Sequence, residues 1–106
     1  MRLEPSIRQT ALLDLQQACD DLWPASPRAA ARWSEDGDAA VQTPGAWPYL
    51  GRPFRLRQGL MPGLRVWRIA HSSYFLFYRV GEETQTLEGW RVRHGARDLP
   101  RRLLES

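Results

Sequence analysis

The chain has 106 residues with 15 basic side chains, all of them arginine, and 12 acidic ones, so its net charge is +3 with both histidines neutral. This length fits one domain, and we expect residues 1–106 to form it. The absence of lysine from the sequence excludes a lysine Schiff base, a lysine general base and a P-loop lysine. It does not exclude contacts to anions, because the arginine fork binds carboxylate and phosphate well.

Charge is unevenly distributed along the chain. Residues 1–50 carry four arginines and seven acids, a net charge of −3, whereas residues 51–106 carry eleven arginines and five acids, a net charge of +6. Such asymmetry predicts a C-terminal surface that meets an anionic partner. The alternative is that the arginines reflect genome composition and only solvate a small sheet.

Cysteine and histidine are too few for a metal centre. Cys19 is the sole cysteine of the sequence, and His71 and His94 lie far apart. We therefore expect no disulfide, no metal and no cofactor. No apolar run approaches the roughly 18 residues of a transmembrane helix, and the first ten residues lack the apolar segment of a secretory signal. A cytoplasmic protein with no membrane contact is the simplest expectation.

Two helices are predicted in the N-terminal half. The first spans about residues 7–23, with Ser6 and Gln9 as a capping box and Pro24 as its end. Its buried stripe is formed by Ile7, Ala11, Leu15, Ala18 and Leu22. The second begins with Ser26 as N-cap and Pro27 in the first turn. It is expected to weaken at Gly37 and to stop before Pro44.

The C-terminal half predicts strands at residues 55–58, 64–70, 74–80 and 84–93, with a further strand possible at residues 2–4. The stretch 74–80 is apolar on both faces and should be central. Gly89 indicates a bulge or a close backbone approach, and the tail could form one or two helical turns. The predicted fold class is α+β, an antiparallel helical hairpin packed on a three- or four-stranded antiparallel sheet with a short C-terminal tail or helix.

The predicted strands also hold the candidate binding residues. They contain Arg55, Arg57, Arg65, Arg68, Arg79, Arg91 and Arg93, interleaved with aromatic residues such as Trp67, Phe75 and Trp90. This mixture suits phosphate contact with base stacking, although any single ring is more often part of the core. His94 is a candidate acid or base. The alternative is a structural histidine that donates to a backbone carbonyl.

Residues 63–80 (GLRVWRIAHSSYFLFYRV) and 91–103 (RVRHGARDLPRRL) resemble the RelE/ParE superfamily of bacterial toxins from type II toxin–antitoxin systems. The segments Ala11-x-x-Asp14-Leu15 and Pro48-x-x-Gly51-Arg52-Pro53 match as well, so the resemblance covers nearly the whole chain. Gly89 and Arg93 depart from it, because apolar residues are usual there. The resemblance implies two helices on a small antiparallel sheet, in agreement with the predicted fold, and an antitoxin partner with apolar anchors and acidic residues.

The superfamily implies two functions. RelE-like members cleave mRNA on the ribosome with basic residues of the sheet, and ParE-like members poison DNA gyrase. Phe75 stands where the nucleases place a catalytic arginine, lysines are absent and no tyrosine follows Arg97. RNA cleavage needs an acid and a base, and arginine is protonated too firmly for either role. We therefore favour a ParE-like gyrase inhibitor, and whether the chain is an enzyme stays open, with an endoribonuclease as the enzymatic alternative.

Two alternatives stay open. In a ribosome-dependent endoribonuclease the catalytic candidates are His94, Arg97 and Arg65. A degenerate chain would only bind an antitoxin. The expected contact residues for target or antitoxin are Arg65, Arg79, His94, Arg97, Arg101 and Arg102. Arg65 and Arg79 could instead be structural, paired with Asp98 or with carboxylates of the helices. No sequence-specific DNA binding is expected of the toxin alone.

Overall fold

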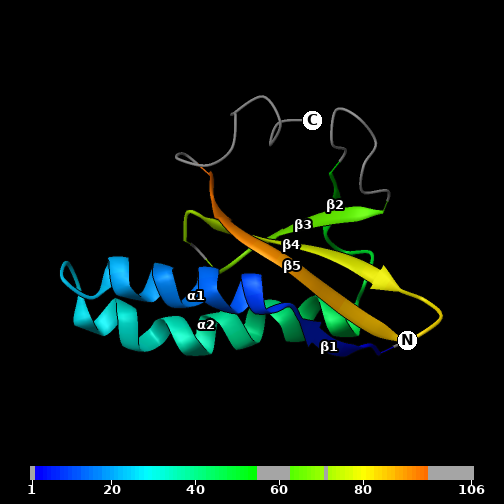
Figure 1. The fold of residues 1–106 in the computed structure, drawn as a ribbon, viewed down its shortest axis with the longest axis horizontal. Coiled ribbons are helices and arrows are strands. Elements are labelled where there is room, and N and C mark those ends of the chain that lie inside the picture. Colours follow the sequence, from blue (N-terminus) through cyan, green and yellow to red (C-terminus); the bar gives the residue numbers. More distant parts are fainter. Residues whose placement is uncertain (1, 55–62, 71, 96–106) are drawn as a thin grey trace.

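The computed structural model describes residues 2–54, 63–70 and 72–95. In it an antiparallel pair of helices, α1 (Gln9–Leu22) and α2 (Pro27–Ala46), lies against one face of a single sheet (Figure 1). The strands are β1 (Glu4–Ile7), β2 (Arg52–Pro53), β3 (Leu64–Arg68), β4 (Tyr74–Gly81) and β5 (Thr86–His94), in the spatial order β1-β5-β4-β3-β2. The α+β class and the helical hairpin are confirmed.

The sheet is larger than predicted and is not wholly antiparallel. It has five strands rather than three or four, and β1 pairs with β5 in parallel, with Glu4 opposite Thr86 and Ile7 opposite Gly89. The N-terminal strand thus falls at residues 4–7 instead of 2–4. The fifth member, β2, is a two-residue pairing of Arg52 and Pro53 with β3. Such a short edge strand gives little periodicity in the sequence.

The predicted capping box of α1 is wrong. Ser6 belongs to β1, where it lies opposite Glu88, so its side chain is not at a helix terminus. The N-cap of α1 is Arg8, which makes no side-chain cap. The chain enters the helix directly from the sheet, because the Arg8 N–H donates to the Gly89 carbonyl at 2.9 Å. Pairing of β1 with β5 places Ser6 in a strand, so Ser6 cannot cap α1.

The start of α2 is confirmed and its end is not. The Ser26 hydroxyl accepts a hydrogen bond from the Ala29 N–H at 3.2 Å, and Pro27 occupies the first turn. The helix continues through Gly37 and Pro44 to Ala46. It buries Trp33, Ala40 and Pro44, and this tertiary packing outweighs the weak helix propensity of the stretch.

The central position of β4 is confirmed, as is the role of Gly89. The register between β4 and β5 shifts beside Phe77 and Tyr78, which lie opposite Arg91 and Gly89, so Trp90 is the extra residue of a bulge. A Cβ on Gly89 would come within 2.6 Å of the Ile7 side chain. The glycine therefore allows β1 to approach the bulged strand closely.

Alternation along β4 separates two apolar clusters. Leu76 and Tyr78 point toward the helices and pack with Trp33, Ile69 and Leu87. The opposite face holds a second cluster formed by Phe54, Leu64, Val66 and Phe77, with Phe75 and Trp90 packed against it. The sheet is thus apolar on both faces at its centre. The predicted strand at 55–58 and the predicted helical tail lie outside the described residues.

Candidate functional site

The sheet face turned away from the helices combines apolar residues with arginines. Arg68 lies opposite Phe75 in the register of β3 and β4, and its Cζ is 6.0 Å from the centre of that ring. Phe75 is half-buried in the second apolar cluster. At the position that the resemblance assigns to a catalytic arginine in nucleases, this chain therefore has a packed aromatic ring with no titratable group.

Trp90 is the centre of the cationic part of this face. The Arg8 Cζ lies 3.4 Å from the centre of the indole ring, and the Arg79 Cζ lies 5.9 Å from it. Cation–π contacts of this kind hold guanidinium groups in place without neutralising them. The indole Nε1 is buried and has no hydrogen-bond partner among the described residues. Arg8 was not among the residues expected from the sequence, because nothing in the sequence links Arg8 to Trp90.

Arg79, an expected contact residue, lies on this face and forms a long ion pair with Glu88. Its Nη2 is 3.9 Å from the Glu88 Oε2, and the side chains are 38 % and 24 % exposed. At this separation and exposure an ion pair contributes little. Its partner is a neighbouring strand residue, whereas Asp98, the partner proposed from the sequence, lies outside the described residues.

Arg65 lies on the opposite face and has a structural role. Its Nη1 donates to the Gly51 carbonyl at 2.6 Å and to the Tyr49 carbonyl at 3.3 Å, and its Cζ lies 5.0 Å from the Tyr49 ring. These contacts fix the crossing between α2 and β2. The structural alternative raised for Arg65 is therefore supported, with backbone carbonyls as partners in place of carboxylates.

Tyr78 lies on β4 opposite Arg65 and also holds the crossing between α2 and β2 in place. Its hydroxyl donates to the Pro48 carbonyl at 2.8 Å and accepts from the Gly51 N–H at 2.9 Å. Burial raises the pKa of Tyr78, and the hydrogen bond from Gly51 and the charge of Arg65 oppose that shift only in part. The tyrosine is thus a neutral, buried anchor for the crossing.

His94, the last residue of β5, lies opposite Tyr74 at the start of β4 and packs edge-on against it, with ring centres 5.0 Å apart. Tyr74 and Tyr78, the strand partners of His94 and Arg65, are four residues apart, about 13 Å along the strand. The structure therefore does not bring Arg65 and His94 together, and Arg79 points from the other face. Arg97, Arg101 and Arg102 lie outside the described residues.

Among the residues that the structure describes, no three histidine, cysteine, aspartate or glutamate side chains gather in a way that could hold a metal ion. Neither α1 nor α2 is long and apolar enough to cross a membrane.

Comparison with known proteins identifies the family. A search of curated proteins finds no significant match. A chain from the structure of a chromosomal ParDE toxin–antitoxin system from P. aeruginosa superposes with a TM-score of 0.68 at 17 % identity, covering 87 % of this chain and 95 % of that one. The toxin–antitoxin complex RelBE2 from Mycobacterium tuberculosis contains a chain with a TM-score of 0.58 at 24 % identity, covering 91 % and 94 %.

These two likenesses establish the fold, which the two structures share with this chain over most of its length. The sequence itself adds a family assignment, since residues 6–99 match the model for the ParE toxin of the type II toxin–antitoxin system parDE. That match includes both helices and all but the first two residues of the five strands. The chain belongs to the ParE toxin family of type II toxin–antitoxin systems.

Proposed function

We propose that this toxin stops bacterial growth by binding and poisoning DNA gyrase in the cytoplasm, and that a cognate antitoxin neutralises it. The observation that carries the proposal is the match of residues 6–99 to the ParE family, whose members are gyrase poisons as the resemblance implies. The inhibition is a protein–protein contact and involves no chemistry on a nucleic acid.

The positions of the expected catalytic residues support this choice over RNA cleavage. A nuclease needs an acid and a base within reach of one phosphodiester. His94 packs on Tyr74, and Arg65 is held by two carbonyls of the crossing, about 13 Å further along β4. Phe75, between them on the opposite face, contributes only an apolar ring.

Antitoxin binding is supported by the relatives and by charge. The P. aeruginosa structure is of a ParDE toxin–antitoxin system and the M. tuberculosis structure is of a toxin–antitoxin complex. Here the sheet face carries Arg8, Arg68 and Arg79 around exposed edges of Phe75 and Trp90. A segment with apolar anchors and acidic residues would complement that surface in an added-strand or helix-in-groove manner.

The proposal is tested with the purified full chain in two parallel assays, supercoiling by purified gyrase and translation in a cell-free extract. We expect loss of supercoiling, accumulation of cleaved DNA and unchanged translation. Cleavage of mRNA with gyrase unaffected would instead establish the endoribonuclease alternative. Inactivity in both assays, for a chain whose folding is verified by circular dichroism, would indicate a binding module that only titrates antitoxin.

His94→Ala separates the two active alternatives further. His94 packs edge-on against Tyr74 and is half-buried, and a gyrase poison needs no acid or base from it, so the folded variant should keep most of its inhibition of gyrase. In a nuclease that uses His94 as acid or base, the same variant would lose about 10²-fold or more in mRNA cleavage.

A further inference from the structure

Strand β5 extends beyond the end of β1, which leaves part of its edge without a neighbouring strand. β1 pairs with residues 86–89 only, although β5 continues to residue 94. On that side of residues 90–94 the described part of the sheet has no further strand. An open strand edge of this kind is a template for pairing with another chain. We refer to residues 90–94 as the terminal edge of β5.

Two side chains of α1 take the place of the missing strand. The Thr10 Oγ1 donates to the Trp90 carbonyl at 3.1 Å, and the Asp14 Oδ2 accepts from the Val92 N–H at 2.9 Å. Four residues of an α-helix advance by about 6 Å and two residues of a strand by about 7 Å, so the two spacings nearly match. One turn of α1 therefore satisfies two successive outward groups of the terminal edge.

Arg91 holds the Asp14 carboxylate against the terminal edge. The Arg91 Nε and Nη2 donate to the two carboxylate oxygens, and the Asp14 side chain is only 17 % exposed. Charge-assisted hydrogen bonds of this kind are stronger than neutral ones. An incoming strand would therefore have to displace a fixed carboxylate before it could reach the Val92 N–H.

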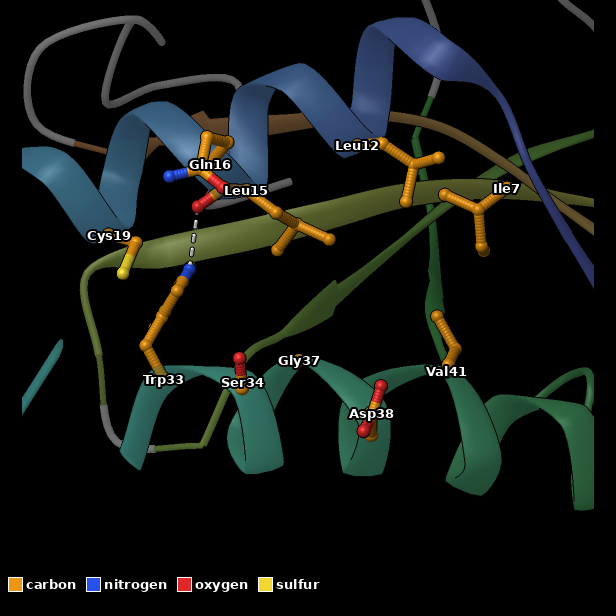
Figure 2. A pocket seen from close by; sticks show the side chains of 10 residues that line it. All are labelled: Ile7, Leu12, Leu15, Gln16, Cys19, Trp33, Ser34, Gly37, Asp38 and Val41. Atoms are coloured by element: carbon orange, nitrogen blue, oxygen red, sulfur yellow. Dashed lines mark hydrogen bonds between the residues drawn. The ribbon is translucent and has the colours of Figure 1, made fainter. Parts of the chain in front are cut away.

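Helix α1 is also held by α2, independently of these two contacts. Figure 2 shows Leu12 and Leu15 projecting from α1 toward α2, and the Trp33 Nε1 donates to the Leu15 carbonyl at 2.9 Å. At about 3.6 residues per turn, Thr10 and Asp14 lie on a different side of the helix from these leucines. Both residues can therefore be substituted while the contacts between the helices are kept.

We propose that Thr10 and Asp14 prevent a second copy of the chain from pairing with the terminal edge of β5. The edge is self-complementary. In an antiparallel pair about a two-fold axis at Arg91, the Val92 N–H of each copy would meet the Trp90 carbonyl of the other. These are the two backbone groups that Thr10 and Asp14 bond within one copy. The inference concerns the free toxin and does not depend on gyrase as the target.

The double variant Thr10→Val/Asp14→Ala of the full chain tests the proposal, because it releases both backbone groups. Valine keeps the shape of threonine and removes its hydroxyl. We expect sedimentation velocity to show a dimer of the double variant at protein concentrations at which the wild type is monomeric. In that dimer Arg91 would face Arg91 of the second copy. Association should therefore be stronger in about 1 M salt, where the Debye length is about 3 Å.

Hydrogen exchange locates the contact. In the double variant the Val92 amide has lost its bond to Asp14, so at low protein concentration it should exchange at least about tenfold faster than in the wild type. At high protein concentration the second copy should protect it again. The wild-type Val92 amide should show no such dependence on concentration. The Leu3 amide, which donates to the Gly45 carbonyl at 2.7 Å, is the internal control and should not respond in either protein.

Two control variants should remain monomeric. Gly51→Ala controls for lost stability, because its added Cβ would overlap the Tyr78 hydroxyl while the terminal edge is unchanged. Thr10→Ser/Asp14→Asn keeps a donor and an acceptor at the two positions. The proposal is overturned if the double variant stays monomeric in high salt, if Gly51→Ala associates equally, or if protection at Val92 does not rise with concentration. Should circular dichroism show the double variant unfolded, Asp14→Ala alone carries the same prediction at Val92.

Discussion

Asp14 and Arg91 form a two-pronged ion pair that joins α1 to β5. The Arg91 Nε donates to Oδ2 at 2.7 Å and Nη2 donates to Oδ1 at 3.0 Å. The Val92 N–H donates to the same carboxylate at 2.9 Å. This edge of β5 lies beyond the end of β1, so the aspartate supplies the acceptor that a longer neighbouring strand would have supplied.

Removing the Asp14 carboxylate should therefore weaken the fold. We expect Asp14→Ala to lower the free energy of unfolding by about 2 kcal/mol, because a charge-assisted pair and a backbone hydrogen bond are lost together. Asp14→Asn, which keeps an acceptor for Val92, should cost about half as much. Urea denaturation measures both.

The matched control for this prediction is Asp20→Asn on the same helix. Asp20 is exposed and, among the described residues, accepts a hydrogen bond from Gln16 alone, so the change should stay within about 0.5 kcal/mol. Equal losses for Asp14→Asn and Asp20→Asn would show that the link to β5 adds nothing to stability.

Gly51 should tolerate no side chain. An added Cβ would overlap the Tyr78 hydroxyl and lie 2.7 Å from its Cε1, and the buried tyrosine has no room to move. We expect Gly51→Ala to lower the free energy of unfolding by about 2–4 kcal/mol. Gly37→Ala is the control, since its Cβ meets Leu15 at 3.6 Å within a helix. That variant should stabilise the chain by about 0.5–1 kcal/mol.

Alanine substitutions of Arg65 and Arg79 should differ in their effect on the free energy of unfolding. Arg65→Ala removes hydrogen bonds to two carbonyls of the crossing and should lower the free energy of unfolding by about 1–2 kcal/mol. Arg79→Ala should stay within about 0.5 kcal/mol, because its pair with Glu88 is long and exposed. Under the proposed function Arg79→Ala, though normally folded, should inhibit gyrase less. A larger loss of stability for Arg79→Ala than for Arg65→Ala would mean that Arg79 is the structural residue and Arg65 is not.

The stability of the fold should fall in alkaline solution through Tyr78. Burial raises the pKa of its phenol above the ordinary value of 10.0. The unfolded chain then loses this proton first, so the free energy of unfolding is unaffected below about pH 10 and decreases as the pH rises from there toward the raised value.

Urea titrations of wild type and Tyr78→Phe between about pH 9 and pH 11 check the prediction. The variant should be less stable at neutral pH, since it loses the hydrogen bonds to Pro48 and Gly51, and its alkaline slope should be smaller. Tyr49 also has a raised pKa, chiefly through its hydrogen bond to Glu82, and Tyr49→Phe measures its share. An unchanged slope in Tyr78→Phe would refute the assignment.

The elements that the sequence predicts are those whose signals are local. Ser26 and Pro27 mark the start of α2, and the apolar run 74–80 marks the central strand. The parallel partner of β5 was misjudged because residues 4–7 are too few to show a period, and Ser6 fits a cap as well as a strand. Helix α2 outlasts Gly37 and Pro44 because distant packing supports it.

The site was predictable only in its composition. Arginines and aromatic rings in the C-terminal strands were expected, and Arg68, Arg79 and Trp90 do share one face. Arg65 falls on the other face because alternate residues of a strand point in opposite directions. The links Arg8–Trp90 and Asp14–Arg91 join residues far apart in sequence, the second pair by 77 positions. No local pattern in the sequence could have paired them.

The pairing of β1 with β5 has a consequence for synthesis of the protein. The first strand finds its partner only at residues 86–89, and Thr10 bonds the Trp90 carbonyl 80 positions further along the chain. During translation residues 4–14 therefore cannot complete these contacts until residues 86–92 have left the ribosome. Such non-local contacts make folding slow, and a nascent chain remains without its finished sheet until that point.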